Sequence, residues 1–119
     1  MNKVFLRGNL VRNPETRTIK MSNDKETKVT NFTVAVSRVF QKSNGEKNKD
    51  VTYIMCEAWD TGAEAISKHF VKGDPILIEG SLKTESWEKD GQKRSIMKVR
   101  VASFERFSTS YQPKEEEVA

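Results

Sequence analysis

The clearest pattern in this chain is an alternation of apolar and polar residues with a period of two, which is typical of strands that bury one face. It is strongest over residues 72–87, where one face carries Ile76, Ile78, Gly80, Leu82 and Thr84. Residues 93–101 alternate again, and the Asp90-Gly91 pair between the two segments is a strong hairpin signal. These residues therefore predict a β-hairpin with one buried face.

Three earlier segments alternate in the same way and predict three more strands. They are residues 3–11, 29–36 and 51–59, whose inward sets are Val4, Leu6, Gly8 and Leu10, then Phe32, Val34 and Val36, then Ile54, Cys56 and Ala58. Gly8 suits a bend or a close approach of two backbones. A turn is expected at residues 13–15 and a short strand at 16–20. The polar stretch 22–28 is predicted to be a loop, and 41–50 a long mobile loop.

Residues 60–70 are the one good helix candidate. Asp60 or Thr61 is expected to cap the helix, and Thr61 has the capping-box spacing to Glu64. Its apolar stripe consists of Ala63, Ile66 and Phe70, and Gly73 is expected to end it.

The predicted order is three strands, a helix and two strands. This order matches an all-β, five-stranded Greek-key barrel with one helix between strands 3 and 4, known as the OB-fold. A β-sandwich is the main rival, but it would need more and shorter strands. Residues 1–107 are expected to form this single domain, and residues 108–119 a short, disordered, acidic tail.

Composition adds a moderately basic character. The chain has 119 residues, a formal net charge of +4 and a pI of about 9.2, and residues 1–113 hold 20 basic against 14 acidic residues, a net +6. A basic body suits a polyanionic partner, although solubility alone would also explain it. One cysteine excludes an internal disulfide. No apolar run suits a membrane span or a signal peptide, so a soluble, cytoplasmic protein is expected.

Large aromatic residues fall on faces that the alternation predicts to be polar. Trp87 lies with the polar set of its arm, and Tyr53 and Trp59 share the face of their strand that points away from the core. Aromatic rings beside cations on a sheet face are suited to stacking unpaired bases. The alternative is that they lie on the surface of a hairpin or at a subunit contact.

An enzyme is not expected. His69 is the only histidine and lies on the predicted helix, and Cys56 points inward, as an inert buried thiol would. No residues have metal-ligand spacing, and no glycine-rich phosphate loop is present. We therefore predict no catalytic residues, no cofactor and no metal.

Over about residues 2–107 the chain resembles the DNA-binding domain of bacterial and phage single-stranded DNA-binding proteins. Three segments carry the resemblance: residues 2–10 with Pro14-Glu15 following, residues 31–37, and residues 72–82 followed by Trp87. The resemblance implies a homo-oligomer, usually a tetramer, that coats single-stranded DNA during replication, recombination and repair. It also implies a location in the cytoplasm or nucleoid, or in the host cytoplasm for a phage-encoded protein.

The resemblance also suggests the residues that contact DNA. The base-stacking aromatics of the family fall on Phe40, Tyr53, Trp59 and Trp87, and its cations on Lys3, Lys42, Lys72 and Lys83; we add Arg7 from the first strand. Simple alternation places Phe40 with the core residues of its strand, so it reaches DNA only if the strand bulges near Ser37-Arg38. The loop that carries Lys42, Lys47 and Lys49 could close over bound DNA.

Two departures from the family pattern stand out. Glu85 and Ser86 occupy positions that are basic in the best-known members, and the chain ends Glu-Glu-Glu-Val-Ala without the acidic, phenylalanine-ended tip that recruits partners in bacteria. These features predict a phage-type or divergent member that does not recruit replication proteins through such a tip. The alternative function is a protein-interaction OB-fold subunit of a replication or primosome assembly, in which the outward aromatics would be interface anchors.

Overall fold

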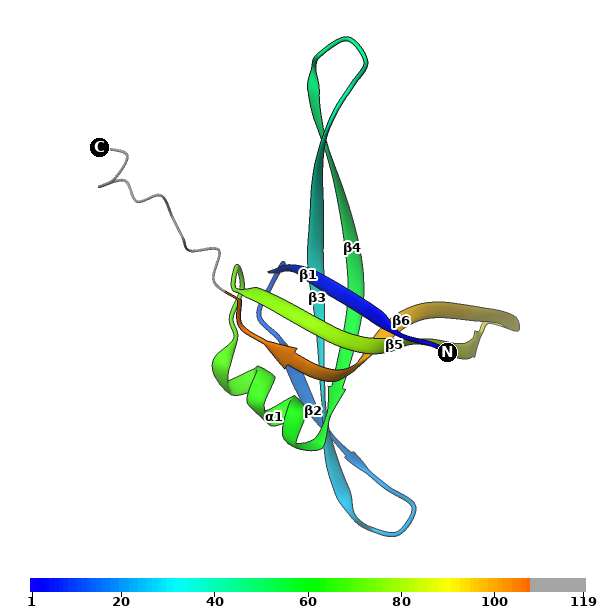
Figure 1. Ribbon diagram of the computed structural model, residues 1–119. Helices are drawn as coiled ribbons and strands as arrows, with labels where there is room; N and C mark the ends of the chain where they lie inside the picture. The colour runs from blue at the N-terminus through cyan, green and yellow to red at the C-terminus, as the bar shows by residue number, and fades with distance from the viewer. Residues whose placement is uncertain (108–119) are drawn as a thin grey trace.

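A computed structural model describes residues 1–107 as a β-barrel with one helix and three projecting hairpins (Figure 1). The elements are β1 (Val4–Leu10), β2 (Glu15–Lys20), β3 (Glu26–Gln41), β4 (Lys47–Trp59), α1 (Asp60–His69), β5 (Pro75–Lys89) and β6 (Gln92–Glu105). The tail predicted for residues 108–119 lies outside the described residues.

The strands close on themselves in the order β1-β5-β6-β4-β3, and β1 completes the ring by pairing with β3. Every pairing is antiparallel except that of β4 with β6, where Cys56 is opposite Val99. β2 follows β1 after a short turn and continues along β3, so β1 and β2 together form one strand of the barrel. The prediction of a five-stranded barrel with a helix after its third strand is confirmed.

The alternating apolar residues meet inside the barrel, where they form the hydrophobic core. Its buried members are Leu10, Phe32, Val34, Cys56, Ala58, Ile66, Phe70, Ile76, Ile78 and Val99. The helix α1 contributes Ile66, and the Thr30 hydroxyl donates a hydrogen bond of 2.8 Å to the Ala63 carbonyl. The predicted helical stripe is therefore confirmed, because Ala63, Ile66 and Phe70 are all buried.

The start of α1 differs from the prediction. Trp59 occupies the N-cap position and makes no side-chain cap hydrogen bond. Asp60 is the first helical residue and has a positive φ of 55°, while its carboxylate accepts a hydrogen bond from the Thr27 hydroxyl. Asp60 is thus engaged with the neighbouring strand β3 instead of capping its own helix.

Two glycines allow the barrel strands to cross closely. A Cβ atom on Gly8 would overlap the backbone of Ala35, and one on Gly80 would overlap the backbone of Arg100. The close approach predicted at Gly8 is confirmed, and Gly80 plays the same part where β5 meets β6. The register between these two strands shifts between Glu79 and Gly80.

Three hairpin arms extend beyond the barrel (Figure 1): the β3–β4 arm, the β2–β3 arm and the β5–β6 arm. The loops predicted at 22–28 and 41–50 are shorter than expected, because β3 begins at Glu26 and the β3–β4 pairing continues to Gln41 and Lys47. Only residues 22–25 and 42–46 of these segments lie outside the strands. In the β2–β3 and β3–β4 arms neither face of the strands is buried outside the barrel, so these segments have no alternation that would reveal the pairing. For the same reason Leu82, predicted to face inward, is exposed on the β5–β6 arm.

The single helix within residues 1–107 lacks the length and apolar character that crossing a membrane would require.

Candidate nucleic-acid interface

The outer face of β4 carries the aromatic residues that the alternation placed there. Tyr53 is 66% exposed, Met55 is exposed beside it, and Trp59 is half-buried at the junction with α1. The prediction that Tyr53 and Trp59 share the face away from the core is confirmed, since neither belongs to the core cluster. Two separate rings therefore stand on one side of this strand.

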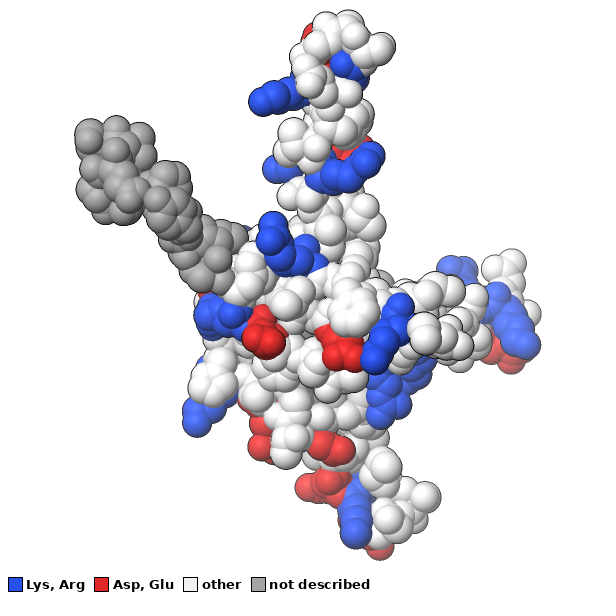
Figure 2. All heavy atoms as spheres, in the orientation of Figure 1, with Lys and Arg blue, Asp and Glu red and all other residues white. Residues whose placement is uncertain are grey.

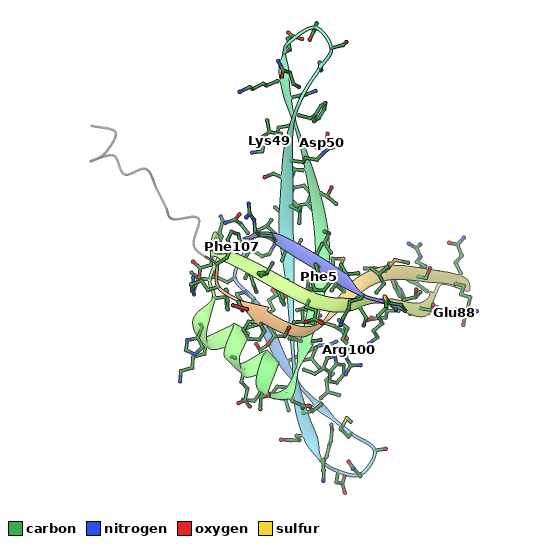
Figure 3. All side chains as sticks on the ribbon, viewed as in Figure 1. Phe5, Lys49, Asp50, Glu88, Arg100 and Phe107 are labelled. Carbon is green, nitrogen blue, oxygen red and sulfur yellow. The ribbon has the colours of Figure 1, made fainter. Side chains whose placement is uncertain are left out.

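Trp59 is held among cations from two other strands. The Arg100 guanidinium of β6 lies 5.1 Å from the centroid of the indole ring, and the Lys83 ammonium of β5 lies 5.7 Å from it. Both distances are within the range of cation–π attraction. Figure 3 shows Arg100 where β6 passes from the barrel into the β5–β6 arm. Trp59, Lys83 and Arg100 thus form a cluster, the Trp59 cluster, in which two positive charges lie beside the indole ring.

Glu57 lies beneath this cluster, with only 3% of its surface exposed. Its Oε2 accepts hydrogen bonds from the Trp59 indole N–H at 2.7 Å and from the Lys83 ammonium at 3.0 Å, and its Oε1 lies 3.4 Å from the Lys98 ammonium. Burial by itself raises the pKa of Glu57, but the two hydrogen bonds and the charges of the two lysines outweigh it, so this pKa is lower than usual. Glu57 is therefore ionised at neutral pH.

Lys98 is the second buried charge of the cluster. Its ammonium lies 2.7 Å from Glu85 and 3.4 Å from Glu57. Desolvation lowers the pKa of Lys98, but the two carboxylates raise it by a larger amount, so this pKa is higher than usual. Lys98 is thus buried and paired with two acidic residues.

Sequence reasoning missed Glu57. The alternation did place it between Tyr53 and Trp59 on the outer face of β4, which was the available signal. Its lysine partners, however, come from β5 and β6, and only the parallel β4–β6 pairing brings them to it. Such a long-range pairing leaves no local mark in the sequence.

The β3–β4 arm carries Phe40 and Lys42. The Arg38 guanidinium lies 5.1 Å from the centroid of the Phe40 ring and 3.5 Å from the Asp50 carboxylate on the opposite strand. The β3–β4 register runs without a shift, so the predicted bulge near Ser37-Arg38 is absent. Phe40 escapes the core because the arm itself leaves the barrel. Figure 2 shows Lys and Arg side chains along this arm, and Figure 3 labels Lys49 and Asp50 on it.

The β5–β6 arm carries Trp87, which is 43% exposed and stands opposite Arg94 in the antiparallel register. Lys83 lies four residues earlier on the same strand, where the arm leaves the barrel. In Figure 2, Lys and Arg side chains gather at this point of departure. Lys83 thus lies between the two tryptophans: Trp59 is beside it on the barrel, and Trp87 follows it along β5 on the arm.

Three of the predicted cations, Lys3, Arg7 and Lys72, lie elsewhere in the structure. The Lys3 ammonium lies 2.8 Å from the Glu79 carboxylate, and its hydrogen bond lowers the pKa of Glu79. The Arg7 guanidinium lies 4.9 Å from the centroid of the Phe107 ring. Lys72 occupies the turn between α1 and β5. Arg7 thus lies on β1, Lys3 just before it and Lys72 in the turn that follows α1, and none of the three is among the cations beside Trp59.

A hollow of about 530 Å³ opens on the outer side of β3 and β4, beside the Trp59 cluster. Its lining includes Met55 from the outer face of β4 and Lys98 from β6, and the turn after β1 forms its other wall. The remaining lining residues are Arg12, Asn13, Glu15, Asn31, Phe32, Thr33 and Cys56. Its walls are mixed in polarity, with cationic, amide and thioether groups.

Residues 1–107 show neither a metal-binding cluster nor a reactive thiol. This part of the chain has no cluster of three or more His, Cys, Asp or Glu residues that could hold a metal ion. Burial raises the pKa of the Cys56 thiol to about 12, so it is not an activated nucleophile.

Comparison with known proteins gives a consistent result. Residues 1–107 match the model of the single-strand binding protein family. The chain is 41% identical over 104 residues to single-stranded DNA-binding protein 2 of Streptococcus agalactiae, a match that covers 87% of this chain and 75% of the relative.

Two solved structures have similar folds. A deletion mutant of the single-stranded DNA-binding protein of Thermus aquaticus aligns with a TM-score of 0.75 and 26% identity, over 92% of this chain and 52% of that one. An SSB of Plasmodium falciparum, solved in complex with single-stranded DNA, also aligns with a TM-score of 0.75, at 20% identity over 90% of this chain and 95% of that one.

Proposed function

The chain belongs to the single-strand binding protein family, and from this premise we propose that it binds single-stranded DNA, with little sequence preference, in replication, recombination and repair. The observation that carries the proposal is the outer face of β4 and its surroundings. There Tyr53 is exposed and Trp59 lies within 6 Å of the cationic groups of Lys83 and Arg100.

Binding of this kind requires two physical contributions. Flat aromatic faces stack on unpaired bases, and each stacked base contributes about 1–3 kcal/mol to binding. Stacking does not depend on sequence, because every base has a π-face. Cations neutralise phosphates and release counterions, which makes affinity fall as salt rises. We assign stacking to Phe40, Tyr53, Trp59 and Trp87, and phosphate contacts to Lys3, Arg7, Lys42, Lys72 and Lys83.

The two cation-bearing arms extend this surface beyond the barrel. The β3–β4 arm offers Phe40 beside Arg38, with Lys42, Lys47 and Lys49 near its tip, and the β5–β6 arm offers Trp87. Single-stranded DNA that crosses the outer face of β4 would contact one arm or both. The arms thus give a small domain a longer contact path than its barrel alone.

We also propose that the protein acts as a homo-oligomer, expected to be a tetramer. Phe5, labelled on β1 in Figure 3, is 68% exposed, and Leu77 on the neighbouring strand β5 is exposed as well. Large apolar side chains on a free sheet face are suited to a subunit contact. Light scattering should give a mass several times 13.6 kDa, and Phe5→Lys should lower it. A monomeric wild-type protein would contradict this part of the proposal.

No enzymatic role forms part of the proposal, because the family is named for binding. The proposed location is the cytoplasm or nucleoid, or the host cytoplasm if a phage encodes the chain. Replication proteins remain possible partners, and a contact through the tail would involve residues 108–119, outside the described residues.

The direct test is a titration with oligo-dT at low and high salt, followed by intrinsic tryptophan fluorescence. The proposal expects strong quenching, because Trp59 and Trp87 stack on bases, and an affinity that falls steeply with salt. A protein-interaction subunit would instead show neither effect and would co-elute with another protein on size exclusion. That pair of results would overturn the DNA-binding proposal in favour of the alternative.

A further inference from the structure

The interface holds two buried charges of opposite sign directly beneath its aromatic face. Among the described residues, only Glu57 and Lys98 are both charged and buried. A buried charge is costly unless it is paired and hydrogen-bonded, so the partners of such a pair are informative. The ion-pair partners of Glu57 are both lysines, Lys83 on β5 and Lys98 on β6.

The strand register explains why a carboxylate is needed there. Lys83 and Lys98 stand directly opposite each other across β5 and β6, and like charges in that position repel. The parallel pairing of β4 with β6 brings Glu57 beside them, 3.0 Å from the Lys83 ammonium and 3.4 Å from the Lys98 ammonium. Glu85 lies 2.7 Å from Lys98 and completes a cluster with no net charge.

Of the two lysines in this cluster, Lys83 is the one that solvent and a phosphate can reach. Its side chain is 36% exposed, whereas that of Lys98 is 10% exposed. A phosphate that approached Lys83 would therefore find an ammonium already hydrogen-bonded to a buried carboxylate. Fewer counterions would be released from such a site than from a free lysine.

We propose that Glu57 is a built-in competitor for DNA phosphate, which masks Lys83 at the centre of the interface and leaves that centre to base stacking on Trp59. The same oxygen that accepts the Lys83 hydrogen bond also accepts that of the Trp59 indole N–H, so one carboxylate both neutralises the cation and orients the ring. Of the cations assigned to phosphate above, Lys83 then contributes least, and the cations of the arms contribute most. This inference rests on the proposed binding of single-stranded DNA.

The test compares Glu57→Gln with Glu85→Gln, two isosteric variants with the same change of net charge. Each binds an oligo-dT strand across a series of KCl concentrations, and thermal melts establish that each is folded. Glu57→Gln keeps an acceptor for Trp59 but releases Lys83. Its affinity at low salt should rise by up to about fivefold, the upper end of the range measured for ion pairs near a protein surface. Its plot of log affinity against log salt should steepen by about 0.7, as for one further phosphate on a single strand.

Glu85→Gln is the matched control, because Glu85 contacts Lys98 but is not among the partners of Lys83. It should leave the salt slope unchanged. The gain from Glu57→Gln should also vanish when Lys83→Gln is present in the same chain, since no lysine is then released. An unchanged or weaker affinity in Glu57→Gln, a gain that survives Lys83→Gln, or an equal gain in Glu85→Gln would each overturn the inference.

A second measurement needs no substitution at Glu57. In the NMR spectrum of the lysine ammonium groups of the wild-type protein, oligo-dT should shift the signals of the arm lysines and leave that of Lys83 nearly in place. A large shift at Lys83 would contradict the masking. If wild-type protein binds no oligo-dT at all, the proposed function fails and this inference with it. If wild-type protein binds and the variants behave alike, only the inference fails.

Discussion

At the scale of single residues, the two tryptophans lie in different surroundings. Trp59 is half-buried, donates a hydrogen bond to Glu57 and lies beside two cations, whereas Trp87 is 43% exposed on an arm. Removal of Trp59 would leave the buried Glu57 carboxylate without one of its donors, which is costly for a charged group. Trp87 is therefore the better position at which to test stacking without disturbing the fold.

We predict that Trp87→Ala lowers affinity for oligo-dT about fivefold to a hundredfold, the loss expected for one stacked base. Its melting temperature should match that of wild type within a few degrees, because the ring contributes nothing to the core cluster. Trp87→Phe, which keeps a flat π-face, should bind nearly as well as wild type. Equal affinities for Trp87→Ala and wild type would mean that this ring does not stack on bases.

The sequence was informative about which side of β4 its residues occupy, but not about their partners. Alternation correctly separated Tyr53 and Trp59 from the inward Cys56, because one face of the strand packs on the core. It could not reveal that Lys83 and Arg100 flank Trp59, since those contacts depend on β4, β5 and β6 lying side by side. Sequence patterns report burial well and cross-strand polar contacts poorly.

At the scale of elements, the β3–β4 arm is the clearest difference between expectation and structure. A polar segment read as a mobile loop is instead paired strand out to Gln41 and Lys47, closed by a turn in which the Lys42 N–H donates to the Glu46 carbonyl at 2.7 Å. Backbone pairing without a buried face leaves no hydrophobic pattern, so only the tertiary structure reveals it. The lysines near the tip are therefore presented on an ordered hairpin.

We predict that the β3–β4 arm contributes to binding but not to folding. Replacement of residues 38–50 by Asn-Gly would join Ser37 to Val51, which are already opposite each other in the register. Because the arm lies outside the core, the melting temperature should change little. Affinity for oligo-dT should fall and its salt dependence should become shallower, since Phe40 and several cations are removed.

The control is the β2–β3 arm, where Asn-Gly in place of residues 21–25 joins the opposed pair Lys20 and Glu26. This arm carries none of the proposed stacking residues, so affinity should stay close to wild type. Comparable losses from the two truncations would indicate a general effect of arm removal and would contradict the specific role of the β3–β4 arm.

At the scale of the whole molecule, closure of the barrel depends on backbones that cross without intervening side chains. Gly8 and Gly80 meet the backbones of Ala35 and Arg100 at the two crossings of β1 with β3 and of β5 with β6. Gly62 is different, because a Cβ atom there would make ordinary contacts, at 3.9 Å from the Ala58 Cβ and 4.0 Å from the Phe104 ring. The two kinds of glycine should respond oppositely to substitution.

We predict that Gly80→Ala destabilises the fold by about 1–3 kcal/mol, the usual cost of overpacking. Gly62→Ala, inside helix α1, should stabilise it by about 0.5–1 kcal/mol, because alanine is the better helix former. Urea denaturation of both variants against wild type measures the two effects. A Gly80→Ala protein as stable as wild type would show that the crossing has room for a side chain.

The overall architecture was the most predictable level. Five alternating segments and one amphipathic helix in a fixed order sufficed for the barrel, because each segment buries one face in a single core. The boundaries and the helix cap were not predictable: Asp60 hydrogen-bonds Thr27 on β3, a contact that only the folded barrel creates. Where tertiary contacts override local preference, the sequence pattern does not predict the boundary or the cap of an element.

The central claim is that bases, and not phosphates alone, are bound by the aromatic surface. It is tested most directly by comparing the affinities for oligo-dT and for an abasic strand of the same length, which has the same phosphates and no bases. We predict that oligo-dT binds at least about tenfold more tightly, given about 1–3 kcal/mol per stacked base. Equal affinities for the two strands would show that binding is purely electrostatic and would contradict the account.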